Sequence, residues 1–159
     1  MTVESPMELA GFSFEPLADT PDAFEFSFRA KSEALGPHIR ARWEWDEEFQ
    51  RNTHRQRLSE KPFFIIWHDG VAIGTLSWMV QPDHARFGEF YLFERYQRQG
   101  LGTCILAHML TLADAARLPV RLEYLKWNPV GGLYRRHGFV PSGESETHVF
   151  MERSSVTPR

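Results

Sequence analysis

The chain has 159 residues, of which 42% are hydrophobic and 25% are charged, so its composition is that of an ordinary globular protein. This composition, with a single cysteine, excludes a disordered chain, a collagen-like repeat and a disulfide scaffold. The length predicts one domain over residues 1–159. Its last residues, about 154–159, are expected to be a frayed tail. The formal net charge of -3 argues against nucleic acid or a membrane as the partner, and the lack of a basic, apolar leader predicts a cytoplasmic protein.

The first sixty residues predict one strand followed by two helices. Phe12–Leu17 alternates between apolar and polar residues, as a strand with one buried face does. Thr20-Pro21 is a typical helix start, with a capping residue before a proline, and Gly36-Pro37 predicts the end of that helix. A second helix is expected from about residue 38 to residue 58.

From residue 63 onward the apolar residues recur with a period of two, which is typical of strands, and one long apolar helix interrupts them. His68-Asp69-Gly70 and Pro82-Asp83-His84 are turn signals between strands of an antiparallel meander. The expected elements are strands over 63–67, 71–80 and 86–93, a helix over 100–118, a strand over 120–124, a short helix over 128–138, and one or two strands from Phe139 to Met151. A meander that passes into a strand–helix–strand crossover predicts an α+β fold, with a mixed, mainly antiparallel sheet flanked by helices.

The segment Gln97–Thr103 joins the third meander strand to the long helix and carries two glycines, Gly100 and Gly102. Glycines let a ligand approach the backbone closely, and the N–H groups of a first helical turn have no intrahelical partner. Such a helix start binds anions, and several charge-assisted hydrogen bonds of about 1.5–3 kcal/mol each outweigh a dipole contribution of about 0.3–1 kcal/mol. The segment therefore predicts a pyrophosphate site. The alternative is a plain helix start whose glycines serve packing.

Taken with a second motif downstream, this turn resembles the GNAT superfamily of acyl-CoA-dependent N-acyltransferases. The matching residues are Gln97, Gly100 and Gly102 in the family's Gln/Arg-x-x-Gly-x-Gly/Ala motif, and Leu133-Tyr134 with Gly138-Phe139 in the signature of its last helix. The resemblance covers about residues 63–153, and residues 43–50 look like one bacterial branch of the family.

The resemblance implies that acetyl-CoA is the co-substrate, held in a cleft where the central strands ending at Phe93 and Tyr124 splay apart. It implies that the backbone of Leu92 and Phe93 pairs with the pantetheine arm, and that Asn128 contacts this arm or caps its own helix. It also implies that Tyr134 protonates the departing thiolate, and a packing role is the alternative for that tyrosine. The diphosphate would contact the residues of the turn, namely Gln97, Arg98, Gln99, Gly100, Leu101, Gly102 and Thr103.

The acceptor amine must be neutral to attack, and the sequence leaves its general base open. Deprotonation at pH 7 costs roughly 4.6 kcal/mol for a lysine side chain and about 1 kcal/mol for an α-amine. Glu123 lies near the position of a catalytic glutamate in ribosomal-protein-alanine acetyltransferases, Glu89 is the other side chain considered, and water is the third option. Trp43, Asp46 and Glu47 form a mixed face of the second expected helix and predict a groove for a cationic acceptor. The alternative for these three is the edge of the core with solvated acids.

Several further residues are expected to be structural. Trp45 and Phe49 share the other face of the second helix and are expected in the core, and Cys104 is expected to pack within the apolar helix. The seven histidines show neither H-x-x-x-H nor HExxH spacing, so no metal site is expected.

Together these observations predict an N-acetyltransferase in which a primary amine of a small molecule or peptide attacks acetyl-CoA directly in a ternary complex. No Cys or Ser nucleophile is placed for a covalent intermediate. The alternatives are a non-catalytic acyl-CoA-binding sensor or regulatory module on the same fold, and a structural interaction domain. The identity of the acceptor and the oligomeric state, a homodimer included, stay open.

Overall fold

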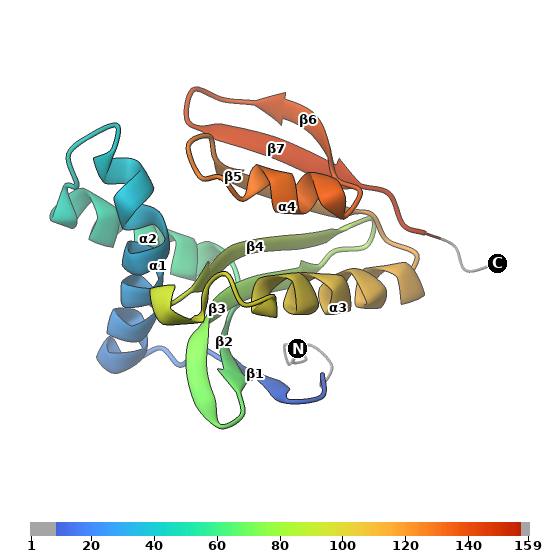
Figure 1. Cartoon of the computed structure of the whole chain (residues 1–159), viewed down its shortest axis with the longest axis horizontal. Coiled ribbons are helices and arrows are strands. Elements are labelled where there is room, and N and C mark those ends of the chain that lie inside the picture. The colour runs from blue at the N-terminus through green and yellow to red at the C-terminus, as the bar shows by residue number, and fades with distance from the viewer. Residues whose placement is uncertain (1–8, 157–159) are drawn as a thin grey trace.

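The computed structural model describes residues 9–156, in which a seven-stranded sheet is flanked by helices (Figure 1). The strand order is β1-β2-β3-β4-β5-β7-β6, and every neighbouring pair is antiparallel except β4 with β5. This is the mixed, mainly antiparallel sheet that the sequence predicts. The elements are β1 (Phe12–Pro16), α1 (Pro21–Arg40), α2 (Glu47–Glu60), β2 (Phe63–His68), β3 (Val71–Val80), β4 (Ala85–Leu92), the 3-10 turn η1 (Glu94–Tyr96), α3 (Leu101–Ala115), β5 (Val120–Leu125), α4 (Gly131–Arg136), β6 (Val140–Glu144) and β7 (His148–Arg153).

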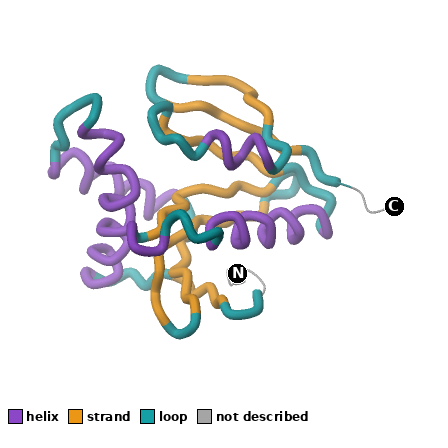
Figure 2. The backbone as a smooth tube through the Cα atoms, viewed as in Figure 1, coloured by secondary structure: helices purple, strands orange, loops and turns teal. Residues whose placement is uncertain are grey.

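The two parallel strands β4 and β5 separate along their length. They pair only at Ala85–Val120 and Arg86–Arg121, although they run on to Leu92 and Leu125. The tube trace shows them diverging from this short contact (Figure 2). The expected splay of the central strands is therefore present, and it opens a wedge in the middle of the sheet.

The apolar core lies between the sheet and the helices α3 and α4, which lie in front of the sheet in Figure 1. Helix α3 has its buried residues at spacings of three and four, as a helix packed on one face does. The buried residues of α3 are Ile105, Leu106, Met109, Leu110 and Ala113. Burial of each large apolar side chain among them contributes about 1.5–3 kcal/mol to stability. Cys104 is exposed, contrary to the expectation, because it lies with the exposed Thr103 and Ala107 on the outer face.

The two N-terminal helices meet at a different place from the one predicted. Helix α1 begins as expected, with Thr20 as its N-cap, but continues through Gly36-Pro37 to Arg40. Leu35 and Ile39, one turn apart, are both buried, and their burial offsets the hydrogen bond lost at the proline. The predicted helix end at Gly36-Pro37 was therefore wrong.

Helix α2 begins only at Glu47, where Asp46 accepts the N–H of Phe49 at 3.0 Å as the N-cap. Residues 41–46 are a connection, so the helical face expected for Trp43, Asp46 and Glu47 does not exist. Trp43 is 47% exposed and Phe49 is 61% exposed, which contradicts a core position for Phe49. Trp45 is half-buried, with the guanidinium of Arg40 5.1 Å from its ring centroid.

No helix within residues 9–156 has the length and apolar character needed to cross a bilayer.

Candidate active site

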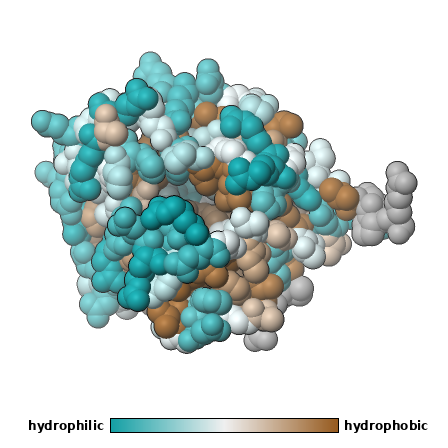
Figure 3. Space-filling view, viewed as in Figure 1, coloured by the Kyte–Doolittle hydropathy of each residue, from teal (hydrophilic) through white to brown (hydrophobic). Residues whose placement is uncertain are grey.

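A pocket of about 580 Å³ lies at the wedge between β4 and β5, and helices α1 and α2 close its far side. Its volume is in the range of sites for small ligands. The space-filling view shows a hollow near the middle of this face, with hydrophobic side chains beside it (Figure 3). Of the predicted site residues, five line the pocket, namely Trp43, Asp46, Glu123, Asn128 and Tyr134.

Glu89 enters the pocket from a β-bulge in β4. Thr75 pairs with Tyr91 but Ser77 pairs with Gly88, so β4 has one extra residue here, and Glu89 takes a φ of 46°. A left-handed backbone at a non-glycine residue costs about 1–3 kcal/mol, and bulges re-aim side chains beside active sites. The sequence carries a signal of this bulge, because the alternation of apolar residues breaks after residue 87.

The Glu89 carboxylate is held in its charged form although only 8% of the side chain is exposed. Lys61 Nζ donates to Oε1 at 3.2 Å and the Tyr91 hydroxyl donates to Oε2 at 3.0 Å. Burial raises the pKa of Glu89, but the nearby Lys61 and Lys31 outweigh it, so the pKa lies below its ordinary value. Glu89 is therefore an anion at neutral pH.

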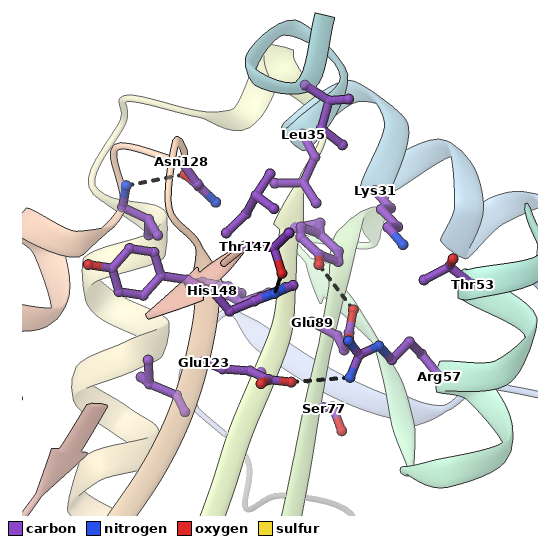
Figure 4. Close-up of a pocket in the computed structure, with 18 of the residues that line it drawn as sticks. Lys31, Leu35, Thr53, Arg57, Ser77, Glu89, Glu123, Asn128, Thr147 and His148 are labelled. Atoms are coloured by element: carbon purple, nitrogen blue, oxygen red, sulfur yellow. Dashed lines mark hydrogen bonds and ion pairs between the residues drawn. The ribbon is translucent and has the colours of Figure 1, made fainter. Parts of the chain in front are cut away.

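Glu123 and Arg57 face each other across the pocket from β5 and α2, with Arg57 Nη1 3.1 Å from Glu123 Oε1 (Figure 4). His148 of β7 lies beside this pair, and its Nδ1 is 2.7 Å from Thr147 Oγ1. Burial lowers the pKa of His148 more than the charge of Glu123 raises it, so the imidazole is neutral at pH 7. From the sequence, His148 falls in the last strand near the expected acceptor side, but nothing in its local pattern distinguishes a site histidine from a core or surface histidine, so it was not predicted as a site residue.

Tyr134 lies in the pocket wall on α4, and it is 5% exposed. Its ring centroid is 5.8 Å from that of Tyr124 and 5.7 Å from that of Phe139. Gly131 lets the Tyr124 hydroxyl lie close to the start of α4, because a Cβ at position 131 would lie 2.5 Å from that hydroxyl. Burial, followed by the neighbouring Tyr124 and Glu89, raises the pKa of Tyr134. The phenol is therefore fully protonated at neutral pH and able to donate a hydrogen bond.

The residues predicted for the acceptor separate into two groups. Asp46 and Trp43 line the pocket, whereas Glu47 is bound to Arg51, whose Nε donates to it at 3.0 Å, and it lies outside the lining. Trp43 meets Trp127 edge-on, with ring centroids 4.3 Å apart. This contact joins the α1–α2 connection to the β5–α4 loop at the mouth of the pocket.

The predicted cofactor turn folds against the end of β4 and lies outside the pocket lining. Gln97 Nε2 donates to the carbonyl of Leu92 at 2.9 Å. The N–H of Phe93 donates to the carbonyl of Ile73 on β3 at 3.0 Å, so by alternation the backbone groups of Leu92 point away from β3, toward the wedge. The carbonyl of Phe93 accepts the N–H of Tyr96, so both backbone groups of Phe93 are used within the chain.

The start of α3 has the features that a diphosphate needs. Gly100 takes a left-handed φ of 80°, and the first intrahelical bond runs from Cys104 N–H to the Gly100 carbonyl at 3.1 Å. The N–H groups of residues 101–103 therefore precede the helical hydrogen bonds, and the first turn holds no acidic residue. A Cβ at Gly102 would lie 3.7 Å from the Phe90 ring, an ordinary contact, so internal packing does not require a glycine there. The chain's residues thus fit the diphosphate of acetyl-CoA at this helix start.

Three further predicted cofactor residues have these surroundings. Arg98 is exposed and has a φ of 60°, and Gln99 Nε2 donates to the carbonyl of Arg95 at 2.6 Å. Asn128 Oδ1 accepts the N–H of Val130 at 3.2 Å, which closes a turn just before α4, whose N-cap is Val130. Among residues 9–156, no group of three or more His, Cys, Asp or Glu could hold a metal ion.

Comparison with known proteins identifies a family. Residues 59–141, more than half of the chain, match the family model of the acetyltransferase (GNAT) domain. No curated protein matches the sequence.

Solved structures share the fold at low sequence identity. The PaiA N-acetyltransferase of Thermoplasma acidophilum, in complex with coenzyme A, has a TM-score of 0.67 and 18% identity over 90% of this chain and 98% of that chain. For an acetyltransferase of Thermus thermophilus the values are 0.66 and 16%, over 95% and 99%. For the ribosomal-protein-S18-alanine N-acetyltransferase of Escherichia coli they are 0.63 and 16%, over 92% and 96%. The chain belongs to the GNAT acetyltransferase family.

Proposed function

We propose that the protein is an N-acetyltransferase that transfers the acetyl group of acetyl-CoA to a primary amine by direct attack in a ternary complex. The observation that carries this proposal is that one pocket, at the splay of β4 and β5, holds a buried protonated phenol, Tyr134, and two carboxylates, Glu89 and Glu123. Membership of the family and the coenzyme A bound to the PaiA enzyme support acetyl-CoA as the donor.

Binding of the donor uses the β4 end and the turn after it. The N–H groups of residues 101–103 would hold the diphosphate, and the absent side chain of Gly102 would leave room for it. The N–H of Leu92 would pair with the pantetheine arm along the open edge of β4. We assign to Asn128 the role of closing the turn that leads into α4, the helix that carries Tyr134.

Acetyl-CoA supplies the thioester, at whose acyl carbon the new C–N bond forms while the C–S bond breaks. Tyr134 would donate its phenolic proton toward the departing sulfur, and a positioned acid is typically worth about 10²–10⁴ in rate. The proton of the amine would pass to Glu123 or Glu89, directly or through water, and the neutral His148 is a third acceptor in the same pocket.

The deciding substitution is Tyr134→Phe, which keeps the ring contacts with Tyr124 and Phe139 and removes only the hydroxyl. Thiol release should be screened across amines, amino acids and peptides, and the affinity for acetyl-CoA should be measured by calorimetry. We expect kcat to fall at least tenfold with the best acceptor, with acetyl-CoA affinity within a few-fold of the parent. The matched control is Tyr96→Phe on η1, outside the pocket lining, which should keep the parent kcat.

An unchanged kcat in Tyr134→Phe would assign this tyrosine to packing. If acetyl-CoA binds but no amine in the panel causes thiol release, the result would instead support the acyl-CoA-binding sensor that the sequence leaves as the alternative.

A further inference from the structure

Lys31 is a buried cation in the wall of the pocket. The residue is 5% exposed, and its side chain points from α1 into the space that Glu89 and Arg57 also enter (Figure 4). Within the described residues 9–156, it makes no hydrogen bond and no ion pair. The other two cations nearby are paired, Lys61 with Glu89 at 3.2 Å and Arg57 with Glu123 at 3.1 Å.

The interior of the pocket therefore holds three cations against two carboxylates. The other charged residues of the lining are exposed, so water screens them; they are Glu44, Asp46, Glu60 and Arg86. Burial lowers the pKa of Lys31, the charges of Arg57 and Lys61 add to this, and the charge of Glu89 opposes it. The ammonium of Lys31 faces the pocket while the rest of the residue is buried, and an ammonium that loses most of its water without gaining a partner is costly. This arrangement is therefore suited to a ligand that brings one negative charge.

The fold by itself does not need a lysine at this position. Residues 27, 31, 35 and 39 follow one another at one-turn intervals along α1, and all four are buried. The other three are Ser27, Leu35 and Ile39, so an apolar side chain at position 31 would complete the stripe. Lys31 is therefore the one charged side chain in this buried stripe.

The charged part of acetyl-CoA is not the partner of Lys31 if it binds as proposed. The diphosphate would lie at residues 97–103, which are outside the pocket lining, and the pantetheine arm in the wedge carries no charge. The negative charge must then come from the acceptor. The Trp43–Trp127 contact at the mouth favours a small, enclosed acceptor over a protein chain.

We propose that Lys31 binds the carboxylate of the acceptor, and that the acceptor is a small amino carboxylic acid rather than a simple amine. In such a zwitterion the amine faces the anionic side of the pocket at Glu89 and Glu123, while the carboxylate pairs with Lys31. This inference rests on the proposed acetyl transfer, and it names the substrate class of the same site.

The test compares matched acceptors and matched variants. Each amino acid in the panel is paired with its amide and with the amine that lacks the carboxylate, and thiol release is measured at varied acceptor concentration. We expect a KM at least tenfold lower for the free acid than for its amide. Lys31→Met should raise the KM of the acid at least tenfold and leave the KM of the amide within twofold, so that the loss is specific to acceptors that carry a carboxylate.

The matched control is Lys126→Met, which removes a lysine that pairs with Glu144 outside the pocket lining and should leave both KM values unchanged. Lys31→Arg, which keeps the charge, should retain a preference for the acid. Lys31→Gln, which is polar and uncharged, replaces Lys31→Met if that variant does not fold, and it should lose the preference. Thermal shift with the best amino acid adds a readout without turnover, with stabilisation of the parent and its loss in Lys31→Met expected.

This inference would be overturned by equal KM values for acids and amides in the parent, or by an equal rise of both KM values in Lys31→Met. Thiol release in those experiments would still support the proposed acetyl transfer. Failure of every amine to release thiol from acetyl-CoA would overturn the proposed function and this inference with it.

Discussion

Replacing His54 with leucine should make the free energy of unfolding less dependent on pH between pH 7 and pH 4. His54 of α2 is fully buried, its Nε2 lies 2.7 Å from Ser27 Oγ, and among residues 9–156 its Nδ1 has no partner. Burial, followed by the charge of Lys31, lowers the pKa of His54 from 6.5 to about 4. The imidazole is surrounded by the rings of Phe24, Phe28 and Phe63, with centroids at 5.3, 5.8 and 5.7 Å.

The sign and size of the effect follow from these two pKa values. Between pH 6.5 and about 4 the unfolded chain binds a proton at His54 and the folded chain does not. The free energy of unfolding therefore falls as the pH falls through this window, and the loss is complete below the folded pKa. At about 1.4 kcal/mol per pKa unit the loss is about 3 kcal/mol, a large part of a typical 5–15 kcal/mol.

The assay is urea unfolding of the parent and His54→Leu at several pH values from 7 to 4. The parent should lose about 3 kcal/mol more than the variant across this range. Ser27 Oγ still donates to the Phe24 carbonyl at 3.0 Å, so the variant leaves that hydroxyl paired. Parallel pH dependences would refute the reasoning, and an NMR titration of His54 in the parent gives a direct check.

Two further substitutions test the binding residues. Gly102→Glu should abolish CoA binding in calorimetry while the thermal melting temperature stays near that of the parent, because the carboxylate repels the diphosphate. The control Gly102→Ala should fold normally and bind more weakly, and parent-like affinity in Gly102→Glu would exclude this helix start as the site. Asp46→Ser keeps an N-cap oxygen for Phe49, so it should raise the KM of a cationic acceptor without loss of stability, whereas Asp46→Ala should also lose about 1 kcal/mol. Equal KM values in the parent and Asp46→Ser would place Asp46 among the purely structural caps.

The sequence predicted best the features that depend on neighbouring residues. The turn with Gly100 was predictable because a tight turn before an apolar helix is encoded within a few positions. The α1–α2 connection was not, because the Gly36-Pro37 stop signal was outweighed by tertiary burial of Leu35 and Ile39. The N-cap at Asp46 was available in the sequence, since two acidic residues follow it, but the continuous helix pattern obscured it.

The charges inside the pocket were the least predictable part. Lys31, Arg57 and Lys61 come from two helices and the connection after the second, and the carboxylates they face, Glu89 and Glu123, come from two strands. No local spacing relates these residues, because the parallel crossover and the bulge bring them together. Their pairing and burial decide their charge states, and neither is written in the local pattern.

The short contact between β4 and β5 also bears on the thermodynamics of the whole molecule. Only two residue pairs join these strands, and beyond them β1–β4 and β5–β7 continue as two parts of the sheet without backbone pairing between them. A ligand that spans the wedge would replace part of the missing backbone pairing between β4 and β5, so its binding free energy would add to the stability of the folded state. At a concentration 100 times its dissociation constant, such a ligand stabilises the native state by about 2.7 kcal/mol. The heat tolerance of this protein in a cell would then follow the local supply of the molecule that fills the wedge.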